Sequence, residues 1–459
     1  MTGPGRIEAR LHALAVRAPR PAWARAALAT LLYLAIVAPY VVSQLTRRSR
    51  LWLVDLTVYR DAGRQVLHDS AQLYVFDTPL LHLPFTYPPF PGLLSTWLAV
   101  VPRLAAGLIW TAAELAAVAW LAARAFRPVL DRTGRGRPFL LAALAGGVLW
   151  LDPVREVVKF GQVDLFMVGL ALADCVAVRP RWPRGALIGL ATAIKLTPGL
   201  FIPYLWLTGR RRAAGVAVAT FVAAEAVAHL VMPAASRDYW TRALFASDRL
   251  GSNAGTSNQS IRGMLLRLHA DQHVTTAAWA LLALLVLAVG ARRALSAHRA
   301  GDEVAAVALV GLVSVAVSPV SWIHHIAWIA LVVAVLADDF TDRRRVAAAL
   351  AVAGLFCLRI TWWGNVLAMH HGPLHPFRVL QDGFGLAVLA LIFSLPWRER
   401  LDASSGVLTE TDGERRARSL TTGRSGIGGA EGMTVQARLV QGIRSRRWGG
   451  ARERGGQVR

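Results

Sequence analysis

Four polar regions stand at the ends of long apolar runs in this 459-residue chain. Each combines several carboxylate, amide, hydroxyl, aromatic or cationic side chains. The regions are DLTVYRDAG (55–63) with the later LPFTYPPF (83–90), REVVKFGQVD (155–164), GSNAGTSNQSIRG (251–263) and SPVSWIHHIAW (318–328). If the chain brings these regions to one face of the molecule, their side chains can form a single site.

These residue types together suit the transfer of a sugar from a lipid phosphate to a hydroxyl group. A carboxylate can deprotonate the acceptor hydroxyl as a general base. Cationic side chains can stabilise the charge that develops on the departing phosphate, a role that a metal ion performs in other enzymes. Amide and aromatic side chains can bind the hydroxyls and the flat apolar faces of a sugar. A carboxylate at the membrane boundary is partly desolvated, which raises its pKa toward values that suit a base.

The candidate residues fall into three groups by the part of the reaction that they suit. Asp55 and Asp61 are the two candidate bases. The candidates for the phosphate or sugar of the donor are Lys159, Gln162, Lys195, Arg262, His324 and His325. The candidates for the acceptor or a sugar are Tyr59, Arg60, Tyr87, Asn258, Gln259 and Trp322.

Long apolar runs must position these candidates, and their length indicates a membrane protein. The chain is 55% hydrophobic and only 17% charged, whereas soluble proteins carry charge on about a quarter of their residues. Runs such as 24–45, 275–291 and 303–319 are near the length that crosses a hydrocarbon layer about 30 Å thick. The composition therefore predicts an all-α, polytopic integral membrane protein.

The positive charge predicts the orientation of these runs. The net charge is +23, but the arginines cluster in short segments between apolar runs and at both ends of the chain. That distribution is typical of cytoplasmic loops rather than of nucleic-acid binding. The two cysteines, Cys175 and Cys357, lie far apart inside apolar runs, so no disulfide framework is indicated.

Placing every arginine cluster in the cytoplasm requires an even number of crossings between clusters, and about twelve spans satisfy this. The expected spans are 25–45, 104–124, 138–151, 164–178, 185–196, 198–208, 213–232, 275–293, 303–320, 323–338, 345–362 and 378–395. The expected extracytoplasmic segments are 46–103, 152–163, 233–274 and 359–377. This places all four polar regions on the extracytoplasmic face. Residues 1–24 are then a basic cytoplasmic N-terminus, 25–396 the membrane domain and 397–459 a disordered, Arg/Gly-rich cytoplasmic tail.

Two irregular segments follow from this topology. The run 88–102 cannot be a full crossing, and its prolines disfavour a helix interior, so we expect a re-entrant or interfacial segment. Residues 185–208 must turn within the membrane around Lys195–Pro198 and form two short helices. Non-helical backbone at membrane depth is tolerated only where it lines a cavity or is buried in protein. A lysine at such a break is expensive unless it is paired or reaches an interface, so Lys195 is a functional candidate.

The motif series DLTVYRDAG, LPFTYPPF, GQVDLF, IKLTPGLF, SNQSIRG and SPVSWIHH resembles glycosyltransferase family 87 in order, from about residue 50 to 330. The resemblance implies a GT-C fold and a polyprenol-phosphate-mannose-dependent α-(1→2)-mannosyltransferase. It implies inversion without a covalent intermediate, a glycolipid or glycan acceptor, and neither metal nor cofactor. It also implies that Asp55, the acid of the first extracytoplasmic loop, is the catalytic base.

Several candidates also have plain structural interpretations. Tyr59 and Tyr87 could belong to an interfacial aromatic belt, and Asn258 and Gln259 could merely close their loop. His324 and His325 are adjacent, so on an α-helix they point about 100° apart, and we expect only one of them to face the site. No carboxylate stands at ligand spacing from the histidines, which argues against a metal there.

A transporter or lipid flippase is the main alternative class for such a chain. A transporter is expected to show inverted repeats and polar residues near the middle of the bilayer. Here the polar residues gather in the expected extracytoplasmic loops, and no repeat is visible, which favours the enzyme. An inactive protein that retains the fold is a third alternative.

Overall fold

The computed structural model describes residues 21–46, 53–79, 81–246, 249, 251–372 and 374–398. Over these residues the secondary structure is helical, apart from two isolated β-bridges, Asp77 with Pro84 and Asn258 with Trp322. The prediction of an all-α chain is confirmed for this part of the protein. The predicted N-terminal segment up to residue 20 and the predicted tail from residue 399 lie outside the described residues.

Four single helices are long and apolar enough to cross a membrane. They are α2 (Ala22–Thr46), α6 (Arg103–Ala125), α13 (Arg211–Val231) and α16 (Gln272–Arg299). Two bent pairs raise the number to six if each pair is one span: α8 (Arg137–Leu149) with α9 (Asp152–Phe160), and α19 (Arg343–Cys357) with α20 (Ile360–Ala368). The chain is therefore a helical membrane protein with several candidate spans, although this length criterion does not reach the twelve spans that the sequence predicts.

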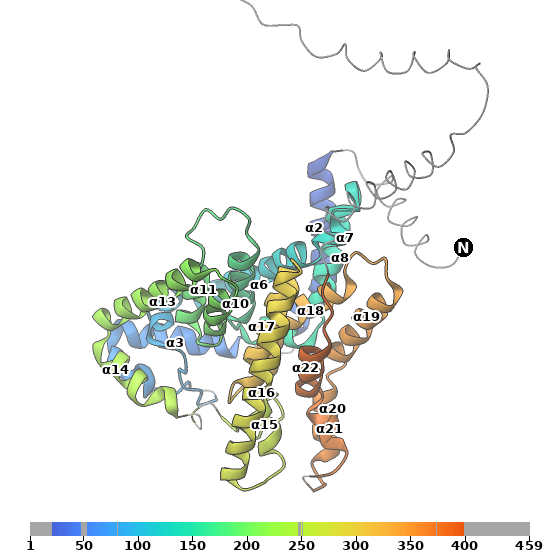
Figure 1. Ribbon diagram of the computed structural model, residues 1–459. Helices are drawn as coiled ribbons and strands as arrows, with labels where there is room; N and C mark the ends of the chain where they lie inside the picture. The colour runs from blue at the N-terminus through green and yellow to red at the C-terminus, as the bar shows by residue number, and fades with distance from the viewer. Residues whose placement is uncertain are drawn as a thin grey trace, which may run out of the picture. The chain divides into compact units, whose positions relative to one another are not determined.

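The remaining predicted spans correspond to shorter helices packed inside the protein. Among them α17 (Glu303–Val317) is the most enclosed, because every residue from Ala305 to Ala316 is buried. α17 contacts α16, α10 (Asp164–Val176), α18 (Ile329–Ala337) and α22 (Gly383–Ser394) (Figure 1). A helix that is apolar on every side is stable only when other elements surround it. α17 therefore forms the centre of the main hydrophobic core.

The predicted break at Lys195–Pro198 is present. α11 (Ala186–Ile194) ends at Lys195, whose backbone is extended (φ −150°, ψ 128°), and the short helices η3 (Thr197–Leu200) and α12 (Phe201–Leu207) follow. Pro198 enters the first turn of η3, where its missing N–H costs no hydrogen bond. The chain thus turns at this lysine instead of continuing one helix through it.

The segment 88–102 forms two short helices, α4 (Pro89–Leu94) and α5 (Thr96–Val100), neither long enough to cross a membrane. They pack against α3 (Val54–His68), the helix that carries the first polar motif. The contact requires a glycine, because a Cβ on Gly63 would stand 2.2 Å from the carbonyl oxygen of Ser95. Arg60 fastens the same contact by donating hydrogen bonds to the carbonyls of Leu98 and Val101.

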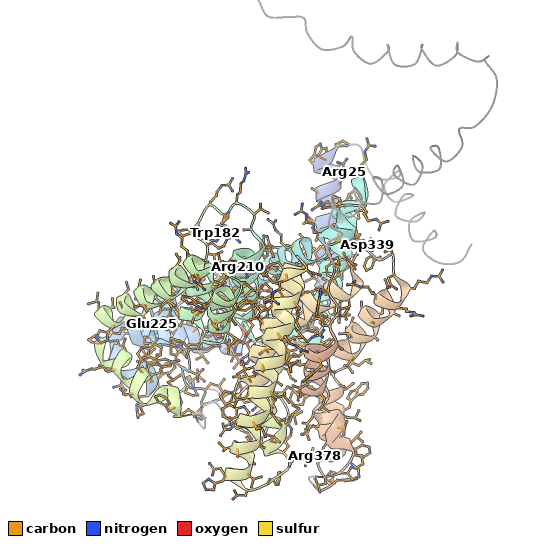
Figure 2. All side chains as sticks on the ribbon, viewed as in Figure 1. Arg25, Trp182, Arg210, Glu225, Asp339 and Arg378 are labelled. Atoms are coloured by element: carbon orange, nitrogen blue, oxygen red, sulfur yellow. The ribbon has the colours of Figure 1, made fainter. Side chains whose placement is uncertain are left out.

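Further short elements complete the described chain between the long helices. They are η1 (Ser70–Tyr74), α7 (Arg127–Leu130), η2 (Gly134–Gly136), α14 (Pro233–Thr241), η4 (Ala243–Phe245), α15 (Ile261–Leu266), η6 (Ile323–Trp328) and α21 (Phe377–Gln381). In the view of Figure 2, Arg25, Trp182, Arg210 and Asp339 lie toward the upper end of the helical body and Arg378 lies at the lower end. Loops that the charge pattern assigns to the cytoplasm therefore share one end.

Candidate active site

Segments from across the sequence converge on one cavity of about 580 Å³. It is enclosed by α3, the loop 81–88, the end of α9 with the turn after it, the break after α11, residues 239–246, Arg249, Ser257 and the segment 318–325. Its polar and aromatic lining residues are Asp55, Tyr59, Thr86, Tyr87, Phe160, Gln162, Lys195, Thr197, Tyr239, Arg249, Ser257, Ser318, Trp322, His324 and His325. Eight of the predicted site residues are thus brought together from regions that lie up to 270 positions apart in the chain (325 − 55).

Asp55 lies in the first turn of α3 and lines the cavity, whereas Asp61 does not line it. Asp61 instead accepts a hydrogen bond from Arg64 at 2.9 Å. Burial raises the pKa of the Asp55 carboxyl to about 6, and this effect exceeds the opposing effects of a hydrogen bond from Gln162 and of the nearby Lys195 ammonium. A carboxylate with a pKa near 6 is ionised at neutral pH and is a stronger base than an ordinary aspartate. Of the two candidate bases, only Asp55 lines the cavity.

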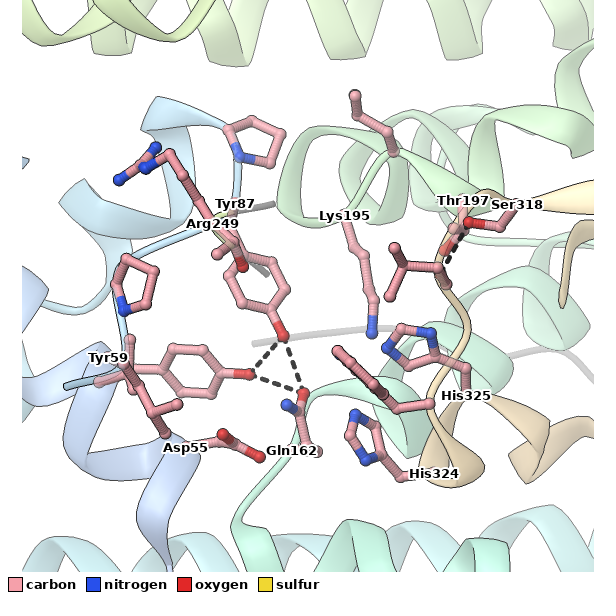
Figure 3. A pocket seen from close by; sticks show the side chains of 18 of the residues that line it. Asp55, Tyr59, Tyr87, Gln162, Lys195, Thr197, Arg249, Ser318, His324 and His325 are labelled. Atoms are coloured by element: carbon pink, nitrogen blue, oxygen red, sulfur yellow. Dashed lines mark hydrogen bonds between the residues drawn. The ribbon is translucent and has the colours of Figure 1, made fainter. Parts of the chain in front are cut away.

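Tyr59, Tyr87 and Gln162 form a triangle beside Asp55 (Figure 3). The tyrosine hydroxyls lie 2.8 and 2.9 Å from Oε1 of Gln162 and 2.9 Å from each other. Since Oε1 accepts from the hydroxyls, the amide nitrogen of Gln162 is left to face Asp55, which accounts for the hydrogen bond that lowers the pKa of Asp55. The two tyrosines therefore orient Gln162, and Gln162 orients the carboxylate of Asp55.

Gly161 makes this placement of Gln162 possible. It ends α9 in the left-handed region (φ 70°), and a Cβ there would stand 2.8 Å from Cβ of Leu56 in α3. The amide of Leu53 also donates to the carbonyl of Lys159 at 2.7 Å, which fixes the start of α3 to the end of α9. In this motif Gly161 therefore allows α9 to pack closely against α3, and Gln162 lines the cavity.

Lys195 is buried and paired with Asp164, the first residue of α10. Its Nζ atom lies 2.8 and 3.0 Å from the two carboxylate oxygens of Asp164. The same ammonium stands 5.7 Å from the ring centre of Tyr87. The break after α11 thus places a fixed, partnered cation in the wall of the cavity.

His324 and His325 both line the cavity, so the prediction that only one of them faces the site is wrong. They lie in the 3₁₀-helix η6, their rings are nearly perpendicular (81°) and the ring centres are 4.7 Å apart. The cavity extends around the first turn of η6 and reaches both rings. Nδ1 and Nε2 of His324 and Nδ1 of His325 are buried without a hydrogen-bond partner among the described residues. Three such nitrogens indicate a place for a polar ligand.

A metal ion has one candidate ligand set in the described part of the chain. One ligand atom each from Asp164, His324 and His325 lies within 4.8 Å of the others. No carboxylate lies near the two histidines in the sequence, but the fold brings Asp164 of α10 beside them. Both oxygens of this carboxylate already accept from Lys195. The ammonium therefore supplies positive charge at the position where a metal would bind Asp164.

Five predicted residues do not line this cavity. Arg60 fastens α5, Lys159 faces a different cavity on the other side of α9, and Arg262 lies 6.0 Å from the ring centre of Trp279. Asn258 and Gln259 are buried and hold the loop together, which was their plain structural interpretation. The side-chain oxygen of Asn258 accepts from the main-chain N–H of Ser321 at 2.9 Å. The main-chain N–H of Gln259 donates to the carbonyl of Ser321 at 2.7 Å. They fix the segment that leads into the two histidines.

The structure adds Asp164, Arg249, Thr197 and Ser318 to the site. Asp164 closes the third polar motif and stands at the start of an apolar run, and a charge at that place is itself a signal of function. Arg249 donates to the carbonyl of Tyr74 at 2.6 Å beside the cavity. Thr197 and Ser318 carry no comparable signal in the sequence, because hydroxyl residues are common in helix breaks and turns.

Comparisons with known proteins identify the family of this chain. The family model described as glycosyltransferase family 87 matches residues 85–319. A curated relative from Mycobacterium tuberculosis is named polyprenol-phosphate-mannose-dependent alpha-(1-2)-phosphatidylinositol mannoside mannosyltransferase. It is 33% identical over 355 residues, which cover 69% of this chain and 81% of the relative.

Two relatives from Mycolicibacterium smegmatis are also similar. One carries the same name and is 34% identical over 53% of this chain and 59% of its own. The other is named as the corresponding phosphatidylinositol pentamannoside mannosyltransferase and is 35% identical over 47% of this chain and 52% of its own. No solved structure matches the chain significantly.

Proposed function

Because the chain belongs to glycosyltransferase family 87, we propose that this glycosyltransferase moves mannose from a polyprenyl-phosphate donor to a hydroxyl of a phosphatidylinositol mannoside. The product has an α-(1→2) linkage. The donor, the linkage and the acceptor class are those that the names of its relatives state for them. The observation that carries the proposal for this chain is the arrangement of the cavity, in which the half-buried carboxylate of Asp55 lines the same space as a lysine and two histidines.

Asp55 acts as the general base in this proposal. Its carboxylate takes the proton of the acceptor hydroxyl as the hydroxyl oxygen attacks the anomeric carbon of the donor mannose. The C–O bond to the phosphate breaks on the opposite side, and its electron pair leaves with the polyprenyl phosphate. Attack and departure on opposite sides invert the configuration, so a β-linked donor gives an α-linked product.

Lys195, His324 and His325 receive the departing phosphate. Figure 3 shows Asp55 on one side of the cavity and these three side chains on the other, with Gln162 between them. The unpartnered histidine nitrogens supply hydrogen-bonding capacity that the protein itself leaves unused. A fixed ammonium and polar groups held in place before the reaction stabilise developing charge without reorganisation. This arrangement supports a mechanism in which Lys195 takes the place of a metal ion and no cofactor is needed.

The site faces the extracytoplasmic side in this proposal. Most of its lining segments belong to loops that the arginine distribution assigns to that side. Trp182, Arg210 and Asp339, from loops assigned to the cytoplasm, lie toward the upper end of the view in Figure 2. The donor carries its mannose on a lipid embedded in the membrane, so a site at the membrane boundary lets the headgroup enter while the chain stays in the bilayer. The family membership favours this reaction over transport of a lipid.

Transfer of radiolabelled mannose tests the proposal directly. Purified full-length protein in lipid nanodiscs should move label from polyprenyl-phosphate mannose to phosphatidylinositol mannoside, and digestion with a linkage-specific α-mannosidase should release it. Asp55→Asn should lower the rate at least about a hundredfold and leave the amount of folded protein unchanged. The matched control Asp61→Asn should stay within about threefold of wild type. Full activity of Asp55→Asn would overturn the assignment of the base, and no transfer to any mannoside would overturn the acceptor.

A further inference from the structure

A second charged cavity, of about 460 Å³, lies on the other side of α9. It shares no lining residue with the first cavity. Its lining residues are Pro39, Tyr40, Ser43, Gln44, Trp150, Asp152, Arg155, Glu156, Lys159 and Arg359. They come from the last turns of α2, from the 80° bend between α8 and α9 and from the 49° bend between α19 and α20. Two broken helices therefore open a space at the same place.

Three cations and two carboxylates line this cavity. Asp152 accepts from Arg155 at 2.5 Å and lies 3.3 Å from Nε of Arg359. Lys159 belongs to the next turn of α9 and points its ammonium toward the ring of Phe160, 4.9 Å from the ring centre. Cations therefore outnumber carboxylates by one. Because Arg359 is half exposed, its guanidinium is available to a ligand as well as to Asp152.

Two buried carboxylate oxygens in this cavity have no partner among the described residues. They are Oδ2 of Asp152 and Oε2 of Glu156, and the two side chains are 1% and 4% exposed. An unpaired buried carboxylate oxygen is costly unless a ligand or water donates to it. The hydroxyl groups of a sugar or polyol can donate hydrogen bonds to such oxygens. Asp152 and Glu156 are four residues apart, so they lie on the same face of α9.

Two aromatic side chains complete the lining. Tyr40 and Trp150 stand with their ring centres 6.5 Å apart, and the Arg155 guanidinium lies 6.0 Å from the centre of the Trp150 ring. The Tyr40 hydroxyl donates to the carbonyl of Arg155 at 2.7 Å, which joins α2 to α9. Aromatic rings of this kind can cover the apolar face of a sugar or an inositol ring.

The end of α2 indicates that the cavity lies at the level of lipid headgroups. Residues Pro39 to Gln44 are the last turns of α2, which is apolar along Ala22–Gln44 and long enough to cross the membrane. The end of such a span lies where the hydrocarbon layer meets the headgroups. A ligand in this cavity is therefore most readily the headgroup of a membrane lipid.

We propose that this second cavity binds the phosphodiester-linked polyol headgroup of an anionic lipid. The phosphate contacts Lys159 and Arg359, and the polyol hydroxyls donate to Asp152 and Glu156. The inference rests on the proposed function in one respect: in phosphatidylinositol mannosides this headgroup is the lipid end of the acceptor. The second cavity then anchors the acceptor while its distal sugar reaches the first.

The two cavities are close enough for one glycolipid to serve both. The Phe160 ring lines the first cavity, packs edge to face on His324 with ring centres 5.9 Å apart, and touches the ammonium of Lys159 from the other side. The last turn of α9 therefore separates them. A headgroup that carries several sugars is longer than one helix diameter, which is about 10 Å.

Lipid retention tests the site without relying on catalysis. Full-length Asp55→Asn protein, exposed to micelles of equal amounts of phosphatidylinositol and phosphatidylcholine, should retain phosphatidylinositol preferentially in native mass spectrometry. Arg359→Gln and Lys159→Gln, each added to this background, should lower the preference about fivefold. Arg237→Gln, which removes an exposed arginine of α14 far from the cavity lining, is the matched control and should change nothing. Equal retention by all variants overturns the proposal.

Steady-state kinetics of the active protein shows whether the second cavity binds the acceptor or a bulk membrane lipid. If the site anchors the acceptor, Arg359→Gln and Glu156→Gln raise KM for phosphatidylinositol mannoside about tenfold, while kcat and KM for the donor stay within about twofold. If lipid retention falls but KM for the acceptor does not change, the site binds structural phosphatidylinositol and the anchoring step is wrong. A rise in KM for the donor overturns the proposal, because it places Arg359 and Glu156 at the donor site. Glu156→Gln keeps the side-chain volume, so loss of folding does not obscure the result.

Discussion

The two cavities on either side of α9 contain similar residue types, but they balance charge differently. In the first, Lys195 is paired with Asp164, and Asp55 forms no ion pair among the described residues. In the second, Asp152 lies between Arg155 and Arg359, and Lys159 adds another cation. In the proposed mechanism Asp55 must keep its carboxylate free for the proton of the acceptor, and Lys195 is paired with Asp164 instead. A headgroup site instead gains from several cations that a phosphate can reach.

Removal of the paired cation should have the largest effect on the first cavity. Lys195→Met leaves the Asp164 carboxylate buried without its partner, which costs about 3–5 kcal/mol of stability, and removes the charge that receives the phosphate. We expect a rate at least about a hundredfold lower together with a lower Tm in detergent. The double variant Asp164→Asn/Lys195→Met should recover much of the Tm and none of the activity. Recovery of activity would show that the pair is only structural.

The pH dependence of transfer should report the buried base. Since burial raises the pKa of Asp55 to about 6, the carboxylate is protonated below that pH and cannot accept the hydroxyl proton. We expect kcat/KM to fall up to about tenfold per pH unit below 6 and to reach a plateau above about pH 7. The profile should be measured with a soluble acceptor analogue, so that lipid ionisation does not contribute. A profile flat down to pH 4.5 would contradict a raised pKa at the base.

Gln162→Leu sharpens the comparison further, because it removes the polar contact that the base does have. The hydrogen bond from Gln162 favours the ionised form of Asp55, so its loss should move the midpoint of the pH profile above 6. At neutral pH we expect activity about tenfold lower. Tyr87→Phe should produce a smaller shift in the same direction, since one tyrosine still holds the amide. A lower rate with an unchanged midpoint would assign Gln162 to the substrate instead of to Asp55.

A chelator should have the smallest effect. In the proposed mechanism the Lys195 ammonium, which donates to both oxygens of Asp164, supplies the cation at this candidate ligand set. Transfer in 5 mM EDTA should therefore stay within about twofold of the untreated rate, an order-of-magnitude expectation for a site whose cation is a side chain. Loss of activity that zinc or manganese restores would show that the ion displaces Lys195.

The chain contains only two lysines, and together they show what the sequence could and could not predict. The sequence predicts both as ligands of the donor phosphate, Lys159 because it stands in a polar region and Lys195 because it stands at a break within the membrane. Lys195 does line the first cavity, but Lys159 points to the other side of α9. A motif predicts that its residues lie near a site. It does not predict which cavity each side chain lines, because neighbouring residues of a helix point in different directions. Gln162 and Lys159 are three positions apart with a left-handed glycine between them.

Asn258 and Gln259 show the same limit in a loop. An amide in a motif could bind a sugar, but the tertiary structure buries both side chains. Asn258 accepts from the Ser321 amide and holds the histidine segment, whereas the Gln259 side chain bonds to the main chain of Gln381 and Gly385. The histidines are expected to diverge as on an α-helix, whereas both rings line one cavity, because the cavity extends around the first turn of η6. Backbone type and burial of this kind depend on packing partners that a single sequence does not display.

Composition, apolar run length and arginine placement determined that this chain is a helical membrane protein, and its ordered motifs determined the family. The same reasoning located the break at Lys195 and the non-spanning segment at 88–102, because proline and charge act locally. Only the tertiary structure decided that Asp55 and not Asp61 lines the cavity, that Asp164 holds Lys195, and that two charged cavities flank α9. Those decisions depend on contacts between segments far apart in the chain, and long-range packing sets them.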